Sequence, residues 1–394
     1  MKILTFSTLF PNAEKPGHGI FVETRLRHLV ASGQVEARVV APIPWFPSTN
    51  PRFGNYARFA KAPRHETRHG ISVAHPRFPV IPKVGMSISP LLLAQAVKPA
   101  IGRMIDEGYD FDLIDAHYFY PDGVAAAMLA RAFNKPLVIT ARGSDITLFP
   151  QYALPRRQIL WAAQRADGII TVCNALRDEI VAMGIDADRV VSLRNGVDLQ
   201  LFHEPAARRP DAMFTLLAVG HLVPVKAQDL IIGALPLLPG VRLVLAGDGP
   251  DRAKLENLAR ELKVTDRVTF PGAVPQAQLP AHYGAADALV LSSSREGWAN
   301  VLLESMACGT PVVASRVYGT PEVVAAPEAG VLMRERSYRG VADAVNALRA
   351  NYPDRGATRR YAERFSWDDT TEGQLRLFDE VLARRAGELA LAQT

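Results

Sequence analysis

Short apolar runs alternate with amphipathic helical patterns in both halves of the chain. Parallel sheets whose buried strands are joined by crossover helices give this alternation. In the first half it predicts strands over Ile3–Ser7, Ala37–Ala41, Leu113–Ala116, Leu137–Thr140, Gly168–Val172 and Val190–Leu193. In the second half it predicts strands over Thr215–Val219, Arg242–Ala246, Val268–Phe270, Ala288–Leu291 and Val312–Ser315. We therefore expect an α/β protein with two parallel sheets.

The stretch between the two halves has the composition of a linker, with two prolines, a basic pair and little apolar periodicity. We expect an N-terminal Rossmann-like domain over residues 1–200, a linker over 201–213 and a C-terminal Rossmann-like domain over 214–367. A helix over about 368–390 is expected to pack back on the N-terminal domain. Ligands of open parallel sheets bind beyond the carboxyl ends of the strands, which predicts a cleft between two facing domains.

Composition excludes several classes of protein. Of the 394 residues, 48% are hydrophobic and 22% charged, which does not fit disordered, collagen-like or disulfide-rich chains. The two cysteines, Cys173 and Cys308, lie far apart in apolar surroundings, as expected of reduced core residues in a cytosolic protein. No apolar run approaches the ~18 residues of a membrane span, and the first residues lack a signal-peptide pattern. We expect a cytoplasmic protein.

The net charge of +5 is unevenly distributed along the chain. Residues 1–200 carry 23 basic and 17 acidic residues, whereas residues 201–394 carry 22 and 23. The excess is densest between Pro51 and Gly70, where aromatic residues are interleaved with the basic ones. Both a solvated loop and a peripheral contact with an anionic membrane fit this stretch, and leucines 91–93 either extend such a surface or belong to the core. A single short basic stretch without a binding module argues against a nucleic-acid partner.

The most informative stretch runs from Ser292 to Pro311, SSSREGWANVLLESMACGTP. A predicted strand ends at the serines, a loop carries Glu296, and Asn300 is expected to cap a helix. Free backbone N–H groups at a helix start, preceded by a glycine, favour phosphate. Glu296 and Glu304 can both accept hydrogen bonds from sugar hydroxyls. Two surface glutamates at an arbitrary spacing are the alternative.

Four other segments lie at or after the ends of predicted strands. In VGHLVPVKAQD, Lys226 is a point charge suited to a diphosphate, although an isolated lysine is usually a solvated surface residue. The glycines of PGHGIFV, residues 16–22, allow close approach of an anion or a sugar, but they do not form a dinucleotide fingerprint. His117 and the Arg142–Asp145 loop end two further strands. A lone histidine there is more often structural.

The segment EGWANVLLE, followed by MACGTPVVAS, resembles the retaining nucleotide-sugar glycosyltransferases of family 4, and the similarity runs from about Met1 to Trp367. The resemblance implies the GT-B fold, with two facing Rossmann-like domains. It implies three catalytic residues, Lys226, Glu296 and His117. It implies that the donor contacts Glu304, His221, Gly17, Gly19, Gly297, Trp298, Ala299, Asn300, Val301 and Gly247. It further suggests acceptor contacts by Arg142, Asp145 and Tyr118.

The implied reaction moves a sugar from a nucleotide diphosphate sugar to a hydroxyl of a glycan or glycolipid acceptor. No Asp-x-Asp motif or metal-ligand cluster is visible, so no metal or other cofactor is expected. The family usually has arginine at position 221 and glycine at 227, where this chain has His221 and Ala227. A bidentate clamp on the diphosphate is thereby lost. An epimerase or hydrolase of the same fold and a non-catalytic sugar-binding protein are the alternatives.

Overall fold

The computed structural model describes residues 1–81, 85–204 and 213–391. The chain divides into two compact units, Met1–Leu193 with Asp368–Thr394, and Arg194–Trp367. The division falls after Leu193 instead of after residue 200, because the residues that follow already pair with the second unit: the Val197 N–H donates to the Phe365 carbonyl at 3.0 Å. Most of the predicted linker, residues 205–212, lies outside the described residues.

The first unit is built on an eight-stranded sheet in the order β10-β9-β8-β7-β1-β2-β5-β4. Neighbouring strands pair in parallel except β4, which is antiparallel to β5. The strands are β1 (Lys2–Phe6), β2 (Glu36–Val40), β4 (His65–Arg68), β5 (Ile71–Ala74), β7 (Leu113–His117), β8 (Leu137–Ala141), β9 (Gly168–Thr171) and β10 (Val190–Ser192), and a separate pair is formed by β3 (Ile43–Pro44) and β6 (Arg77–Phe78).

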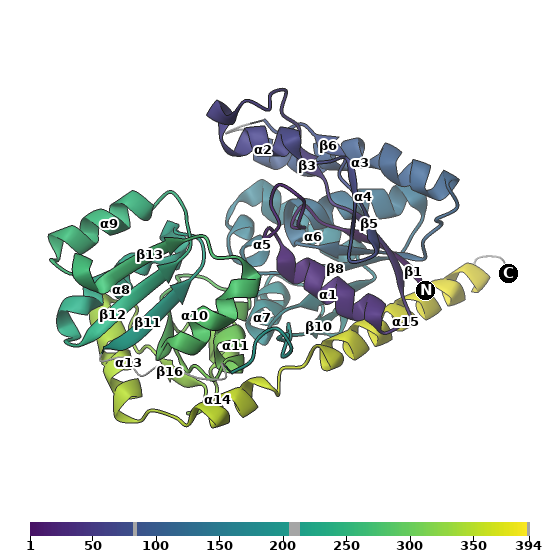
Figure 1. The fold of residues 1–394 in the computed structure, drawn as a ribbon. Coiled ribbons are helices and arrows are strands. Elements are labelled where there is room, and N and C mark those ends of the chain that lie inside the picture. Colours follow the sequence, from purple (N-terminus) through teal and green to yellow (C-terminus); the bar gives the residue numbers. More distant parts are fainter. Residues whose placement is uncertain (82–84, 205–212, 392–394) are drawn as a thin grey trace. The chain divides into compact units, whose positions relative to one another are not determined.

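Helices cover both faces of this sheet (Figure 1). They are α1 (Ile20–Ala31), α2 (Asn55–Lys61), α3 (Ser89–Asp106), α4 (Val124–Phe133), α5 (Ser144–Thr147), α6 (Ala153–Arg165), α7 (Asn174–Ala182) and the C-terminal α15 (Trp367–Leu391). One face is covered by α1 and α15, whose buried side chains share a core with those of β1, β7 and β8. Leu375, Phe378 and Val381 of α15 belong to that core, so the end of the chain completes the first unit.

The second unit contains a six-stranded, fully parallel sheet in the order β13-β12-β11-β14-β15-β16. Its strands are β11 (Phe214–Val219), β12 (Val241–Ala246), β13 (Val268–Gly272), β14 (Ala288–Leu291), β15 (Val312–Ala314) and β16 (Gly330–Leu332). Its helices are α8 (Gln228–Ala234), α9 (Arg252–Glu261), α10 (Leu279–Ala285), α11 (Asn300–Ala307), α12 (Thr320–Val323), α13 (Tyr338–Ala350) and α14 (Arg355–Ala362).

The predicted strands are all present, with ends shifted by no more than two residues. They are buried on both faces, which is why their apolar runs are nearly continuous. The short strands β3, β4, β5, β6 and β16 were not predicted. The basic stretch between Pro51 and Gly70 is not a simple loop, because it contains α2 and β4. Both cysteines are buried and free, as expected. No helix among the described residues is long and apolar enough to span a bilayer.

In each sheet, the strands that come first in the chain lie on one side and the later strands lie on the other side. The two groups of strands meet at one point of the sheet. In the first unit it lies between β1 and β7, and in the second unit between β11 and β14. Loops that leave the carboxyl ends of these neighbouring strands diverge to opposite faces and leave space for a ligand. These loops contain the residues that the sequence singles out.

A buried polar contact anchors α15 to the sheet of the first unit. The Arg25 Nε donates to the Gln374 Oε1 at 2.7 Å, and the Gln374 Nε2 donates to the Asp115 Oδ2 at 3.2 Å. Burial lowers the pKa of Arg25 to about 10, so this arginine remains charged at neutral pH inside the unit. A single amide side chain therefore bridges a buried cation and a buried carboxylate.

Replacing this amide is expected to destabilise the first unit. In Gln374→Leu, the buried guanidinium and carboxylate each lose a partner, which we expect to lower the free energy of unfolding by about 2–4 kcal/mol. Urea denaturation followed by circular dichroism measures this change. The control is Glu372→Ala, on the exposed side of the same helix. Equal stability of the two variants would contradict a structural role for Gln374.

Candidate active site

Two loops of the second unit are tied together at the carboxyl edge of its sheet. They follow β11 and β14, which pair in parallel. The Ser292 hydroxyl donates to the carbonyls of Lys226 at 3.0 Å and Ala227 at 2.7 Å, and the Ser294 N–H donates to the Val225 carbonyl at 2.8 Å. The serines at the end of the predicted strand therefore hold the lysine loop in place.

This arrangement brings together two residues that were predicted to act in one site. The Lys226 Nζ lies 2.6 Å from the Glu296 Oε1. Their side chains are 27% and 11% exposed, so the ion pair lies at the surface of the unit and is open to solvent on the lysine side. A lysine held in this way presents a positive charge at a fixed place.

The turn around Lys226 also explains the residue types beside it. Ala227 adopts left-handed backbone angles, φ 49° and ψ 44°, where glycine is favoured. Position 247 requires glycine, because a Cβ there would lie 1.9 Å from the Gly220 carbonyl oxygen. The Nδ1–H of exposed His221 donates to the Asp248 carbonyl at 2.8 Å. In the neutral tautomer its Nε2 is left as an acceptor and cannot donate to a phosphate oxygen.

The glutamate loop leads into α11, but the expected helix cap is wrong. Ala299 is the N-cap residue and offers no side-chain hydrogen bond, and Asn300 is the first helical residue. The Asn300 Oδ1 instead accepts from the Asn195 Nδ2 at 3.2 Å. No side chain caps the first turn of the helix, where the N–H groups of Asn300 and Leu302 donate to the carbonyls of Trp298 at 3.1 Å and Ala299 at 3.0 Å. The positive end of the helix dipole there still favours an anion.

The other residues of this loop divide into buried and accessible ones. Trp298 and Ala299 are buried, and the indole ring packs 6.0 Å from that of Phe365, so these two side chains support the loop from inside. Gly297 and Val301 are half-buried. A donor contact by Trp298 or Ala299 is thus confined to the backbone.

Glu304 lies one turn into α11 and is paired within the unit. The Tyr283 hydroxyl donates to its Oε2 at 2.7 Å. Burial raises the pKa of Glu304 to about 7, with the hydroxyl of Tyr283 acting in the opposite direction. The carboxyl group is therefore held by one hydrogen bond and titrates near neutral pH.

In the first unit, the two predicted glycines have different roles. A Cβ on Gly19, which has φ 69°, would lie 2.3 Å from the Leu9 carbonyl carbon, so the fold itself requires glycine at this position. Gly17 faces open space, and a Cβ would meet nothing within 4 Å. Only Gly17 leaves room that a ligand could use.

Asp122, which the sequence analysis did not single out, joins the loops after β1 and β7. Its Oδ2 accepts from the Thr8 N–H at 2.6 Å and from the Ser7 hydroxyl at 3.3 Å. Burial raises its pKa to about 7. Its partners are more than 100 residues away in the sequence, so no local pattern could have identified them.

His117 ends β7 and is fully engaged by protein groups. The Arg142 Nη2 donates to its Nδ1 at 2.7 Å, and its Nε2–H consequently donates to the Asp115 Oδ2 at 3.1 Å. Burial lowers the pKa of His117 to about 4, so the ring is neutral at pH 7. Both ring nitrogens have partners within the first unit, where the ring also positions Arg142. The catalytic role that the resemblance implies for His117 stays a prediction.

The predicted acceptor residues also lie partly inside the unit. The Asp145 carboxylate is fully buried and accepts from the backbone N–H groups of Phe119 at 2.7 Å and Gly143 at 2.6 Å, so it holds the loops and is not available to an acceptor. Tyr118 is half-buried and shares a hydrogen bond of 2.6 Å with the Ser144 hydroxyl. Within residues 1–81, 85–204 and 213–391, no three metal-ligating side chains cluster.

Comparison with known proteins identifies the family. Residues 17–201 match the model of glycosyltransferase family 4, and residues 202–365 match that of glycosyl transferases group 1. The chain is 32% identical over 302 residues to the D-inositol 3-phosphate glycosyltransferase of Mycobacteroides abscessus, which covers 71% of this chain and 68% of that protein. The chain belongs to glycosyltransferase family 4. A second D-inositol 3-phosphate glycosyltransferase, from Mycolicibacterium smegmatis, is 30% identical over 71% of the chain and 69% of its own length.

Solved structures show that this glycosyltransferase has the GT-B fold. Sucrose-phosphate synthase from Thermosynechococcus elongatus superposes with a TM-score of 0.81 at 21% identity, over 98% of this chain and 100% of that chain. Anabaena HepE in complex with UDP superposes with a TM-score of 0.71 at 20% identity, over 96% and 100%. Two parallel sheets in two units are what this fold requires.

The raised pKa of Glu304 predicts a pH-dependent effect on stability. A folded-state pKa above the ordinary value of about 4.3 means that ionisation opposes folding, and this loss grows as the pH rises from about 4 to 7. Glu304→Gln keeps an oxygen that can accept from Tyr283 but cannot ionise. We expect it to be about 1–2 kcal/mol more stable than the parent protein at pH 8, with little difference near pH 4.

Melting curves between pH 4 and pH 8 measure this effect. The control is Glu328→Gln, an exposed glutamate of the same unit, for which no such trend is expected. A constant difference between Glu304→Gln and the parent protein at all pH values would show that the carboxyl group does not titrate as described.

Proposed function

We propose that this glycosyltransferase transfers a hexose from a nucleotide diphosphate sugar to a hydroxyl acceptor with retention of the anomeric configuration. The observation that carries the proposal is the Lys226–Glu296 pair, held at 2.6 Å beside the uncapped start of α11. A fixed cation next to the positive end of a helix suits a diphosphate, and nearby carboxylates suit sugar hydroxyls.

The proposed chemistry places charge where these groups can receive it. As the bond between the anomeric carbon and the diphosphate lengthens, Lys226 and the first N–H groups of α11 stabilise the growing negative charge. The acceptor hydroxyl attacks from the face that the diphosphate leaves, and a phosphate oxygen takes its proton. Glu296 then binds the sugar, and Glu304 binds the ribose hydroxyls of the nucleotide.

The residues of the first unit receive narrower roles in this proposal. Gly17 lets the chain approach the ligand, and His117 acts through Arg142 as a positioning residue. Arg142 is buried, with its guanidinium carbon 5.3 Å from the centre of the Phe21 ring, and burial lowers its pKa to about 9. Since Lys226 and the helix N–H groups already neutralise the diphosphate, the proposal includes no metal or other cofactor, and undiminished transfer in EDTA would agree with it.

The acceptor that we propose is a lipid-linked or growing cell-surface glycan. Relatives of this chain include glycosyltransferases of D-inositol 3-phosphate, and one similar solved structure is a sucrose-phosphate synthase, so phosphorylated acceptors occur among similar proteins. We also propose a cytoplasmic enzyme in peripheral contact with the membrane, because basic and aromatic residues gather around α2. Sedimentation with anionic vesicles at low salt tests this contact.

A panel of nucleotides and nucleotide sugars tests the proposed donor. Anabaena HepE has been solved with UDP and with UDP-glucose, so the panel begins with uridine donors. We expect one nucleotide series to raise the melting temperature selectively, because a ligand that binds only the folded state stabilises it. Incubation with that donor alone is the control, since release of free nucleotide without an acceptor would indicate a hydrolase or epimerase instead.

Removal of the Lys226 charge is expected to affect turnover more than binding. In Lys226→Met, we expect kcat to fall about 100-fold while the dissociation constant of the donor changes several-fold, because the charge matters most as the diphosphate departs. Steady-state kinetics and calorimetry measure the two effects. Lys254→Met, an exposed lysine on α9, is the matched control. Wild-type kcat in Lys226→Met would remove the proposed role.

A further inference from the structure

A cavity of about 240 Å³ opens in the first unit at the carboxyl edge of its sheet. Its lining includes Phe10, which follows β1, Ala41 and Pro42, which follow β2, and Pro121, which follows β7. The strands β7, β1 and β2 are neighbours in the sheet, at the point where the earlier and the later strands of the chain meet. This is the position at which open parallel sheets bind ligands.

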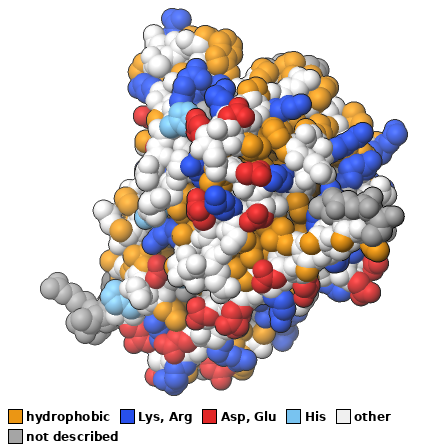
Figure 2. All heavy atoms as spheres, turned by 90° about the vertical axis from the view of Figure 1, so that its right-hand side faces the viewer, with side chains coloured by type: hydrophobic (Ala, Val, Ile, Leu, Met, Phe, Trp, Pro, Cys, Tyr) orange, Lys and Arg blue, Asp and Glu red, His pale blue; other side chains and the backbone are white. Residues whose placement is uncertain are grey.

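The cavity walls are mainly apolar and continue into exposed apolar side chains. Ile43 and Phe78 line the cavity from β3 and β6. Just beyond these strands, Trp45 is 57% exposed and Val80 is 47% exposed. Figure 2 shows hydrophobic and basic side chains intermingled over the upper part of the molecule, where Figure 1 places α2, β3 and β6. An apolar chain could thus run from the cavity onto the surface.

One cation, Lys15, lines this cavity, and a second, Arg58, lies near it outside the lining. The Lys15 Nζ lies 3.9 Å from the centre of the Phe59 ring, and both residues line the cavity. The Arg58 guanidinium donates to the backbone carbonyl of Glu14, the residue before Lys15. Burial and the nearby charge of Arg58 both lower the pKa of Lys15. In the described part of the chain, neither cation forms an ion pair with a carboxylate.

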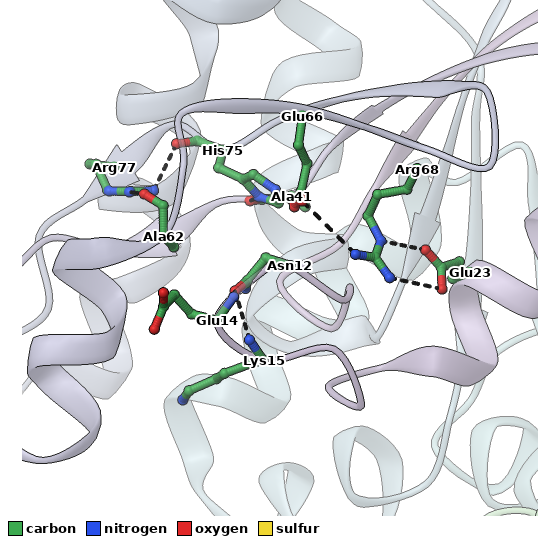
Figure 3. A network of polar contacts seen from close by, with 10 residues as sticks. All are labelled: Asn12, Glu14, Lys15, Glu23, Ala41, Ala62, Glu66, Arg68, His75 and Arg77. Carbon is green, nitrogen blue, oxygen red and sulfur yellow. Dashed lines mark hydrogen bonds and ion pairs between the residues drawn. The ribbon is translucent and has the colours of Figure 1, made fainter. Parts of the chain in front are cut away.

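Glu14 stands directly before Lys15, but among the described residues no ion pair links its carboxylate to Lys15 or Arg58, and the next acidic residues along the chain have other partners. Glu23 pairs with Arg68 at 2.6 Å, and Glu66 pairs with His75 at 2.7 Å (Figure 3). The His75 Nδ1 lies 2.8 Å from the carbonyl of Ala41, so this network also fixes one wall of the cavity. Lys15 extends away from the network, and its backbone N–H donates to the Asn12 side chain at 3.0 Å. The uncompensated positive charge therefore remains at the cavity.

We propose that this cavity binds an acceptor whose sugar is attached through a phosphate to a hydrocarbon chain, with the phosphate at Lys15 and Arg58 and the start of the chain against the apolar wall. The inference rests on the proposed function, of which it specifies the acceptor. A mainly apolar lining favours a lipid phosphate over a phosphorylated polyol, because its polar side chains, Thr8, Asn12 and His18, already form hydrogen bonds within the unit and offer a polyol's hydroxyls few partners. Phosphate supplies the negative charge that two adjacent cations lack.

Calorimetry on the full-length protein with farnesyl phosphate, farnesol and glycerol 3-phosphate tests this inference. We expect farnesyl phosphate to bind at least about tenfold more tightly than either of the other two, because only it satisfies both the cations and the apolar wall. Lys15→Met and Arg58→Met should each weaken its binding about tenfold, whereas Lys15→Arg should retain it. Lys61→Met, an exposed lysine of α2 outside the cavity, is the matched control and should change binding less than about twofold.

Three results would overturn the inference. They are no binding of farnesyl phosphate, equal binding of glycerol 3-phosphate, and an equal loss of binding in Lys61→Met, which would indicate a diffuse electrostatic attraction. Melting temperatures confirm that each variant is folded. If either Lys15→Met or Arg58→Met does not fold, the binding measured with the other one tests the inference. Nucleotide binding by the same protein separates the two proposals. If the protein binds nucleotide but not farnesyl phosphate, only the acceptor assignment is removed. If it binds farnesyl phosphate but no nucleotide, the proposed donor is removed.

Discussion

The hydrogen bonds between the loops after β11 and β14 are the constraint on which the candidate donor site depends. Ser292 and Ser294 donate to three successive carbonyls, those of Val225, Lys226 and Ala227. The third of these residues has left-handed backbone angles, which disfavour alanine by about 1 kcal/mol. The serine contacts help to offset that strain. They also fix the backbone from which Lys226 reaches Glu296, a residue 70 positions away in the sequence.

The acidic residues of this site are already hydrogen-bonded within the unit, and this affects how a ligand can bind. Lys226 and Glu296 are partly exposed, so their pair contributes only about 0–1 kcal/mol and a diphosphate can displace it at little cost. Glu304 differs, because it is half-buried, its carboxyl group accepts from Tyr283, and its pKa is raised to about 7. Hydroxyl groups, which can accept as well as donate, can bind this carboxyl group in either protonation state. The site thus combines an ion pair that a ligand can displace with a carboxyl group held by Tyr283.

The sequence was sufficient to predict the strands that are buried on both faces of the two sheets, because such strands leave nearly continuous apolar runs. It was insufficient for β4, whose polar residues alternate between exposed and half-buried positions. The family resemblance placed Lys226 and Glu296 in one site, but their ion pair became apparent only in the structure, where the two loops leave neighbouring parallel strands. The partners of His117 could not be predicted, because the chain that orients its ring passes through Asp115 to Gln374, 259 residues further along. Contacts of that kind depend on where α15 packs, which no local pattern indicates.

The buried contacts of the first unit limit which residues can determine acceptor specificity. His117, Asp122 and Asp145 lie at or beyond the ends of strands, yet their polar atoms hold neighbouring loops or strands, and their burial keeps them from solvent. In the acceptor site that we propose, recognition is then left to side chains carried by the loop after β1 and by α2, which can change without disturbing the sheet. Lys15 and Arg58 are residues of this kind. A family can therefore keep one framework for the donor while its members accept different molecules, and the motifs that identify the family do not identify the acceptor.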